Sequence, residues 1–148
     1  MCSKDMKMSY FQLRITTPNG KSHRRITSFF NNQLINGRQF HSDRILTGSF
    51  DKTAKIWNPT SGNCLNTLWG HTAEIVAAEF NPNLGEQVVT CSMDKTARVF
   101  HAETGQEIQL LGDHKAEVIS ARFNKDGNLL LTASFDETAI VWDLRMKE

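Results

Sequence analysis

The ten residues GSFDKTAKIW at positions 48–57 recur as CSMDKTARVF at 91–100 and as ASFDETAIVW at 133–142. The aspartates of the three copies, Asp51, Asp94 and Asp136, are 43 and 42 residues apart, and an aromatic residue follows each of them six residues later. A fixed period of about 20–50 residues is typical of proteins built from stacked structural repeats. We therefore expect one structural unit that repeats along the chain.

Within one period the sequence favours strands over helices. Short runs rich in valine, isoleucine, threonine and aromatic residues alternate with turn-forming residues. In the second period these runs predict four strands, at 75–80, 87–91, 97–101 and 107–111. Four consecutive strands joined by short turns predict one four-stranded antiparallel sheet per period.

Two further motifs keep the same register. Gly70-His71 precedes the first strand of the second period, and Trp142-Asp143 ends the third strand of the third. With the S-x-D-x-T turns, they make residues 43–148 resemble the WD-repeat β-propellers. The resemblance implies an all-β, partial propeller of about three four-stranded antiparallel blades, with repeats at 43–71, 72–114 and 115–148. The runs HTAEIVAAEFNPN, FDKTAKIW and Phe30-Asn31-Asn32 are similar to the early blades of one subfamily, the dynein assembly factors with WD repeats.

Residues 1–42 are expected to form a divergent N-terminal segment. A strand at 25–30 is predicted as a degenerate first strand of the first blade, and a long loop, NNQLINGRQFHSD, leads from it to a strand at 44–48. A further strand at 11–16, turned by Pro18-Asn19-Gly20, would make 11–30 a hairpin. In the same arrangement of twelve strands, the strand at 11–16 would be able to supply the missing outer strand of the blade that ends at Trp142, which is how WD propellers close their ring.

Three blades are fewer than the roughly four to eight of closed propellers, so apolar faces and sheet edges would stay uncovered. The sequence therefore favours a truncated form of a larger propeller. Self-association through the open blade edges and a nonfunctional fragment are the alternatives.

In WD repeats a histidine, a strand hydroxyl, the turn aspartate and a third-strand tryptophan form a hydrogen-bonded tetrad, and the resemblance implies this structural role for the matching residues. These are Thr47, Asp51 and Trp57 in the first blade, with His23 as a candidate histidine; His71, Thr90 and Asp94 in the second; and His114, Thr132 or Ser134, Asp136 and Trp142 in the third. Phe100 replaces the tryptophan of the second blade and has no ring N–H donor, so we expect that blade to lose one link. Asp113 is an extra residue between Gly112 and His114, so the spacing does not decide whether His114 occupies the tetrad position.

Hydroxyl, histidine and aspartate are also the residue types of a hydrolase triad. A catalytic set is needed once, however, whereas these residues recur in every period, so we expect a noncatalytic protein. The alternative is an enzyme that uses a tetrad histidine and aspartate. Since the five histidines lack the spacing of metal ligands and no GxxxxGK[ST] or GxGxxG motif occurs, we expect no metal and no other cofactor.

Function is then expected at a surface. In the propeller family, the residue before the turn aspartate and the residues that enter the first strand reach the top face, where partners dock. The matching residues are Phe50, Met93 and Phe135, with Glu74 and Glu117 beside them. They predict an apolar spot with an acidic border that suits a partner protein. Alternatively, these side chains only cover the central channel.

The composition, with 39% hydrophobic and 22% charged residues, is that of an ordinary globular protein. No apolar run predicts a membrane span or a secretory signal, and the three widely spaced cysteines, Cys2, Cys64 and Cys91, favour free thiols in the cytoplasm. Residues 1–42 carry seven Lys/Arg against one Asp, but few aromatic residues interleave with them, so neither nucleic acid nor membrane is an expected partner.

The subfamily resemblance implies an adaptor in axonemal outer-arm dynein assembly and intraflagellar transport. Its partners would be outer-arm dynein subunits and intraflagellar transport components. It would be found in the cytoplasm and in the cilium or flagellum and its basal body. The alternative is a generic WD-repeat scaffold, such as a ubiquitin-ligase receptor or a chromatin adaptor.

Overall fold

The computed structural model describes residues 8–13, 26–31, 35–41, 44–83 and 86–145, and every regular element among them is a β-strand. The strands are β1 (Met8–Leu13), β2 (Ile26–Asn31), β3 (Ile35–His41), β4 (Arg44–Ser49), β5 (Ala54–Trp57), β6 (Cys64–Leu68), β7 (Ile75–Phe80), β8 (Gln87–Ser92), β9 (Ala97–His101), β10 (Glu107–Leu111), β11 (Val118–Phe123), β12 (Leu129–Ser134) and β13 (Ala139–Asp143). No helix of membrane-spanning length and hydropathy occurs in the described part of the chain.

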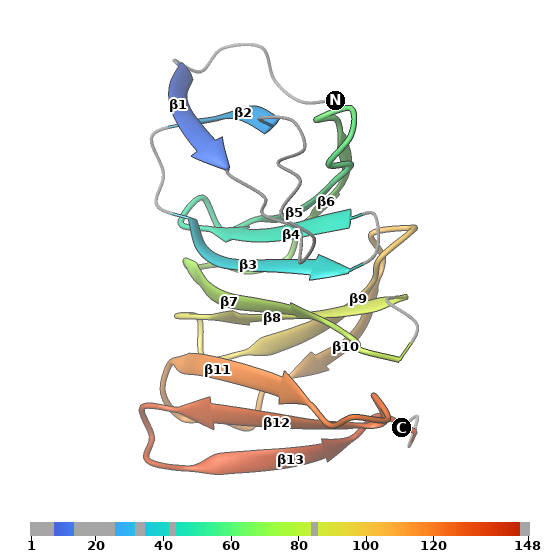
Figure 1. The fold of residues 1–148 in the computed structure, drawn as a ribbon. Coiled ribbons are helices and arrows are strands. Elements are labelled where there is room, and N and C mark those ends of the chain that lie inside the picture. The colour runs from blue at the N-terminus through green and yellow to red at the C-terminus, as the bar shows by residue number, and fades with distance from the viewer. Residues whose placement is uncertain (1–7, 14–25, 32–34, 42–43, 84–85, 146–148) are drawn as a thin grey trace.

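The strands form antiparallel sheets that follow one another in chain order, as Figure 1 shows from β3 down to β13. The first sheet is β3-β4-β5-β6, the second is β7-β8-β9-β10, the third is β11-β12-β13, and β1 and β2 form a separate pair. The predicted all-β architecture of repeated antiparallel sheets is confirmed, as are the four strands of the second repeat. In the described part of the chain, the third sheet has three strands instead of the four of a complete blade.

The predicted loop at 31–43 is wrong, because β3 lies within it. β3 pairs with β4 from His41 opposite Arg44 to Ile35 opposite Ser49, so β3 and not the strand at 25–30 is the first strand of the first sheet. Asparagine and glycine made this stretch resemble a loop. The register shifts between Ile35 and Gly37, and such a bulge tolerates residues of poor strand propensity while the buried β4 supplies the pairing.

The predicted N-terminal hairpin is present, with different bounds. β1 pairs with β2 from Met8 opposite Asn31 to Leu13 opposite Ile26, whereas the turn expected at Pro18-Asn19-Gly20 lies outside the described residues. The second expected role of this strand, completing the third sheet, is wrong for the described chain, since β1 pairs with β2 and the third sheet ends at β13. Pairing β1 with β2 is local and closes a shorter loop than a return across three sheets would.

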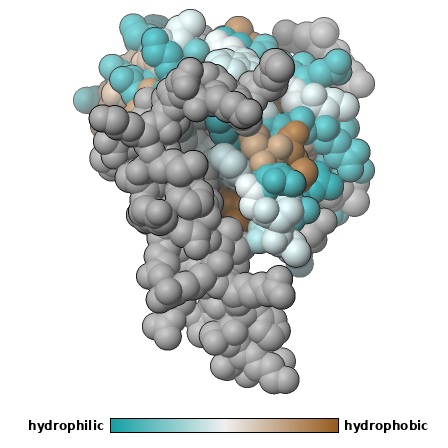
Figure 2. All heavy atoms as spheres, turned by 90° about the horizontal axis from the view of Figure 1, so that it is seen from above, coloured by the Kyte–Doolittle hydropathy of each residue, from teal (hydrophilic) through white to brown (hydrophobic). Residues whose placement is uncertain are grey.

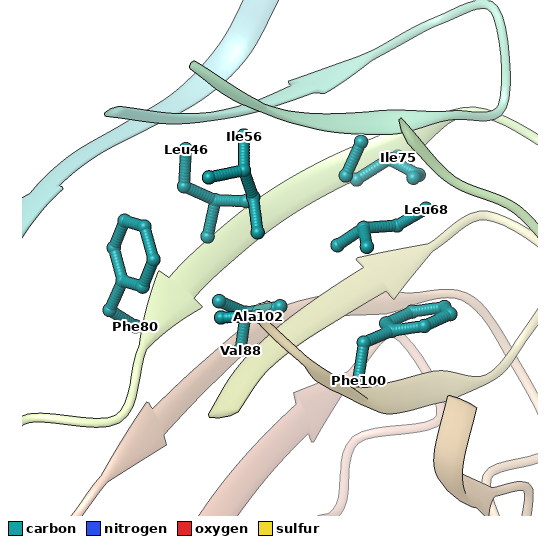
Figure 3. Packing of buried hydrophobic residues seen from close by; sticks show 9 residues of the cluster. Leu46, Ile56, Leu68, Ile75, Phe80, Val88, Phe100 and Ala102 are labelled. Atoms are coloured by element: carbon teal, nitrogen blue, oxygen red, sulfur yellow. The ribbon is translucent and has the colours of Figure 1, made fainter. Parts of the chain in front are cut away.

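Two apolar clusters hold the sheets together, and each lies between neighbouring sheets. In the first, Leu46, Ala54, Ile56 and Leu68 of the first sheet pack against Ile75, Phe80, Val88, Phe100 and Ala102 of the second, as Figure 3 shows. In the other cluster, Val89, Cys91, Ala97, Val99 and Leu111 of the second sheet pack against Val118, Ala121 and Leu130 of the third. The side chains of Val88 and Val89 therefore lie in different clusters, because successive residues of a strand point to opposite faces of the sheet. The two middle strands of the second sheet, β8 and β9, thus bury side chains on both faces.

Polar contacts at one end of the strands add to this packing. The Asn66 side chain donates to the backbone carbonyls of Ala102 and Glu103, at 2.9 and 2.7 Å, and joins the first sheet to the second. The Asn81 side chain donates to the Gly127 carbonyl at 2.8 Å and joins the second sheet to the third. The three sheets are thus connected by hydrogen bonds as well as by apolar contacts.

Gly48 of β4 lies close to Ile75 of the second sheet. A Cβ atom at this position would lie 2.6 Å from Cγ2 of Ile75. We expect Gly48→Ala to lower the free energy of unfolding by about 1–3 kcal/mol, because the added methyl overpacks the cluster. Urea denaturation measures this change.

The matched control is Gly112→Ala, since no heavy atom lies within 4 Å of a Cβ built there. Its effect should stay within about 0.5 kcal/mol, as for most open surface sites. Equal effects of the two substitutions would contradict the close contact at Gly48.

Candidate protein-interaction surface

The turns after β4, β8 and β12 have one common construction. In each, an aspartate Oδ1 accepts hydrogen bonds from the amide and the hydroxyl of the threonine two residues later, and for Asp94 and Thr96 the distances are 2.9 and 2.6 Å. The residue between them has a left-handed backbone, with φ of 71° at Lys52, 72° at Lys95 and 67° at Glu137. Because the bonded aspartate fixes the turn, the residue before it is held in the same place in every sheet.

The residues before the aspartates are Phe50, Met93 and Phe135. The side chain of Phe135 is 62% exposed and that of Phe50 is 40% exposed, while Met93 is half-buried. The Met93 amide donates to the Glu74 carbonyl and the Phe135 amide donates to the Glu117 carbonyl, both at 3.0 Å. The structure therefore places the expected residues next to each other in pairs, and we call Phe50, Glu74, Met93, Glu117 and Phe135 the top surface.

The charge around the top surface is mixed. Glu74 is exposed and Glu117 is half-buried. Lys52 and Lys95 are also exposed, at the tips of the first two turns, whereas the third turn has Glu137. The surface thus offers apolar contact area with charges of both signs, and its third turn is the most acidic.

The third sheet contains all four members of a tetrad. Trp142 Nε1 donates to Thr132 Oγ1 at 2.8 Å, Thr132 Oγ1 lies 2.8 Å from His114 Nε2, and His114 Nδ1 lies 2.9 Å from Asp136 Oδ2. A neutral imidazole satisfies both contacts by accepting at Nε2 and donating from Nδ1. The inserted Asp113 therefore leaves His114 in place, and Thr132 rather than Ser134 provides the hydroxyl.

Ser134 has a different task in the same turn. Its hydroxyl donates to the Ala116 carbonyl at 3.0 Å and accepts from the Asp136 amide at 3.1 Å. Ser92 makes the equivalent contacts with the Ala73 carbonyl and the Asp94 amide. These serine hydroxyls therefore link each turn to the segment that precedes the first strand of the same sheet.

Among the described residues, the other two sheets each show only part of this set of hydrogen bonds. In the second, His71 Nε2 lies 2.8 Å from Thr90 Oγ1 and His71 Nδ1 lies 2.7 Å from Asp94 Oδ2, while Phe100 contributes packing alone. In the first, Trp57 Nε1 donates to Thr47 Oγ1 at 2.9 Å and that hydroxyl donates to the Lys55 carbonyl at 3.4 Å. Asp51 bonds within its turn, and the candidate His23 lies outside the described residues.

Thr90, His71 and Asp94 have the spacing of a nucleophile, a base and an orienting acid, but they are closed to substrate. Thr90 has no exposed surface, and the side chains of His71 and Asp94 are 1% and 4% exposed. A hydroxyl without exposed surface cannot attack a dissolved substrate. The three side chains satisfy one another's buried polar atoms, and they connect β8 to the turn that holds Met93.

The environment of His71 changes its acidity. Burial lowers the pKa of His71, and Asp94 offsets part of this effect. Burial alone would raise the pKa of Asp94, but hydrogen bonds from Thr96, His71 and the Thr72 amide together lower it. Both groups therefore bind protons more weakly in the folded chain than in the unfolded one.

Acid should destabilise the second sheet in two stages. The unfolded chain binds the additional His71 proton below pH about 6.5 and the additional Asp94 proton below pH about 3.8, so stability is lost as the pH falls through each value. Each proton contributes at most about 1.4 kcal/mol per pH unit. In urea titrations between pH 7 and 5, His71→Asn should give a shallower slope than the wild type. Equal slopes would contradict a neutral, buried His71.

Among the described side chains, no three histidine, cysteine, aspartate or glutamate residues cluster as metal ligands. Cys91 is buried, and burial raises the pKa of its thiol, with a further contribution from Glu79. Cys64 is half-buried, and its Sγ donates to the Asn66 carbonyl at 3.4 Å.

The sequence analysis missed a second set of exposed apolar side chains. They lie on or beside the outer strands β6 and β10 and are Leu65, Trp69, Ile108 and Leu110. The alternating pattern of these strands could have revealed them, since residues next to a buried Leu68 or Leu111 point the other way. Figure 2, which views the stack of sheets from the end nearest β1 and β2, shows apolar residues gathered in a patch among mostly polar described ones.

The family model for the WD domain, G-beta repeat, matches residues 21–58, 62–101 and 105–143. These matches span most of the chain, which therefore belongs to the WD-repeat family, a family that typically supplies noncatalytic scaffolds for protein–protein interaction.

Three relatives show the range of similarity. The chain is 48% identical over 43 residues to human dynein assembly factor with WD repeat domains 1, covering 29% of this chain and 10% of that protein. It is 31% identical over 77 residues to the F-box/WD repeat-containing protein 7 of Drosophila melanogaster, covering 49% of this chain and 6% of that protein. It is 45% identical over 40 residues to coatomer subunit beta'-1 of Arabidopsis thaliana, covering 27% and 4%. The matched part is thus a tenth or less of the length of these relatives.

Proposed function

We propose that the chain binds a partner protein through its top surface. The observation that carries this proposal is the repeated turn, which holds an apolar side chain beside a glutamate-bearing segment in the second and third sheets. The hydrogen-bonded networks of the second and third sheets fix these turns, and their threonine and histidine side chains are buried. The top surface can therefore contribute apolar contact and desolvation, which are sources of affinity in protein–protein interfaces.

We further propose that the partner belongs to outer-arm dynein assembly, with the chain acting as an adaptor to intraflagellar transport in the cytoplasm and the cilium. The identity of 48% with the human dynein assembly factor and of 50% with the zebrafish protein, each over 43 residues, supports this choice. The expected partners are outer-arm dynein subunits and transport components.

The experiment is proximity labelling in ciliated cells, with the labelling enzyme fused to the whole chain. We expect outer-arm dynein subunits and transport proteins among the enriched partners. Enrichment of neither group, with other proteins recovered, would contradict the adaptor role. A generic WD-repeat scaffold would then be favoured, and the longer matched stretch in the F-box/WD repeat-containing protein supports that second candidate.

Substitutions at the top surface should weaken partner binding without unfolding the chain. We expect Phe50→Ser and Phe135→Ser together to reduce the captured partner at least about tenfold, because exposed aromatic residues are frequent anchors of interfaces. Phe135 is the more exposed of the two, so Phe135→Ser should change stability by less than about 0.5 kcal/mol, and Phe50→Ser, at 40% exposure, by about 1 kcal/mol or less.

The control is Leu65→Ser, an exposed apolar residue of the outer strand β6. It should leave capture unchanged. Loss of capture with Leu65→Ser, and retention with the double variant, would place the binding site on the outer strands instead.

A further inference from the structure

The turns after β4, β8 and β12 differ in charge at one exposed position. The residue with the left-handed backbone is Lys52 in the first turn, Lys95 in the second and Glu137 in the third, with φ of 71°, 72° and 67°. All three residues are exposed. Because the turns share one construction, equivalent places at the top surface carry a cation in the first two sheets and an anion in the third.

The segment that enters the third sheet adds further carboxylates. Asp113 is exposed and Glu117 is half-buried, and within the described part of the chain no hydrogen bond or ion pair engages either carboxylate. The Phe135 amide donates to the Glu117 carbonyl at 3.0 Å, so this segment lies against the third turn. Lys115 is the one cation in residues 112–118. Negative charge therefore exceeds positive charge around Phe135.

Glutamates on other parts of the sheets have cationic partners. Such ion pairs are formed by Glu79 and Arg122, by Glu103 and Arg44, and by Glu107 and Arg98. The carboxylates beside the third turn differ from these because they are left to solvent. They are therefore available to a cation from outside the described chain.

The aspartate of the third turn adds to the negative potential. Hydrogen bonds from the Thr138 hydroxyl, the Lys115 amide and His114 hold the pKa of Asp136 below its usual value. Asp136 is therefore ionised at neutral pH. Since these groups already occupy its oxygens, Asp136 contributes negative potential and leaves direct contacts to Glu117 and Glu137.

The apolar residue of the third turn is also the most exposed of the three. Phe135 is 62% exposed, compared with 40% for Phe50, while Met93 is half-buried. A phenyl ring packs against aliphatic groups, and its face also attracts cations. An exposed ring among unpaired carboxylates suits a segment with an apolar residue next to a cation, whereas an acidic segment would be repelled.

We propose that the top surface accepts a basic segment of the partner protein at the third turn. An aliphatic residue of this segment packs on Phe135, and a neighbouring arginine or lysine lies beside the carboxylates of Glu117 and Glu137. Lys52 and Lys95 repel this cation from the other two turns. The inference rests on the proposed function, because it specifies the chemistry of the partner at the same surface.

The probe is a labelled, capped synthetic peptide, Gly-Leu-Arg-Gly-Leu-Arg-Gly. Fluorescence anisotropy with the full chain should show saturable binding that weakens as salt is added, since salt screens exposed charges. Replacing both arginines of the peptide by glutamate should weaken binding at least about tenfold, because like charges then face each other. Replacing both leucines by serine should weaken it at least about threefold, because the apolar contact is lost.

Charge reversals in the chain locate the site. Glu137→Lys should weaken binding of the basic peptide at least about tenfold. The turn tolerates lysine, since Lys95 has the same left-handed backbone at the equivalent position. The matched control is Glu86→Lys, which makes the same change of charge at an exposed residue before β8, at the end of that strand opposite to its turn. It should leave binding unchanged, and a thermal melt verifies that both variants fold.

A gain of binding provides a further check. Lys95→Glu gives the second turn the charge of the third, so it should strengthen binding of the basic peptide at least about twofold. Any of four results would overturn the inference: no saturable binding of the basic peptide to the wild type, equal binding of the glutamate peptide, equal binding to Glu137→Lys, or an equal loss with Glu86→Lys. The last result would mean that net charge alone attracts the peptide.

Capture of the partner from ciliated cells separates this inference from the proposed function. We expect both Glu137→Lys and the double variant Phe50→Ser and Phe135→Ser to lose the partner. Loss with the double variant and retention with Glu137→Lys would overturn the basic character of the segment alone. Retention with both would contradict the top surface as the binding site, and with it the proposed function.

Discussion

Replacing His71 with alanine should lower the free energy of unfolding by about 2–4 kcal/mol. The substitution removes an imidazole that contacts both Thr90 Oγ1 and Asp94 Oδ2, and it leaves these buried groups without that partner. An unsatisfied buried polar group costs about 1–3 kcal/mol, and the space of the lost ring adds to this cost. Urea denaturation followed by circular dichroism measures the loss.

His101→Ala is the matched control, because it removes a histidine of the same sheet that is only half-buried. The His101 ring accepts the Glu103 and Thr104 amides at 3.3 and 3.4 Å, so its removal should cost less than about 1 kcal/mol. If His71→Ala were as mild as His101→Ala, the tetrad would not be a structural element. Turnover that disappears in a still-folded His71→Ala chain would favour an enzyme instead.

Leu111→Ala should be the most damaging apolar truncation of an outer strand, at about 2–5 kcal/mol. Leu111 is buried in the cluster between the second and third sheets, beside Val99 and Val118. Deleting three side-chain carbons there removes buried contacts and leaves a cavity that a packed cluster cannot fully close.

The neighbouring Leu110 provides the control. It has the same side chain on the opposite face of β10 and is exposed, so Leu110→Ala should cost less than about 1 kcal/mol. Equal losses in urea denaturation would mean that the cluster between the sheets does not carry the stability of the stack.

The repeated parts of this fold could be predicted because the same local chemistry appears three times. The aspartate and threonine of each turn make the same two hydrogen bonds, so one motif predicts both the turn and the strands on either side. The loss of one link at Phe100 also follows from the residue type alone, since a phenyl ring has no N–H donor.

The first sheet was harder to predict. β3 contains Asn36 and Gly37, residues that favour turns, and it becomes a strand through pairing with the buried β4. Such pairing is a tertiary effect that a local pattern does not reveal. The three-stranded third sheet, by contrast, could be anticipated, because no run that predicts a fourth strand follows Trp142 within the sequence.

The position of His114 shows a further limit. An extra residue, Asp113, changes the spacing to the preceding strand, and spacing alone left the role of the histidine open. In the folded chain, contacts with Thr132 and Asp136 at 2.8 and 2.9 Å place the ring where His71 lies in the second sheet. Short connections absorb such an insertion more easily than strands do.

The most direct test of the proposed interaction is site-specific photocrosslinking of the whole chain in ciliated-cell lysate. A photoreactive residue is placed at Met93, in the top surface, or at Leu65, on the outer strand β6. We expect covalent adducts with a partner protein at position 93 and none at position 65. Adducts at position 65 alone would contradict the top surface as the binding site.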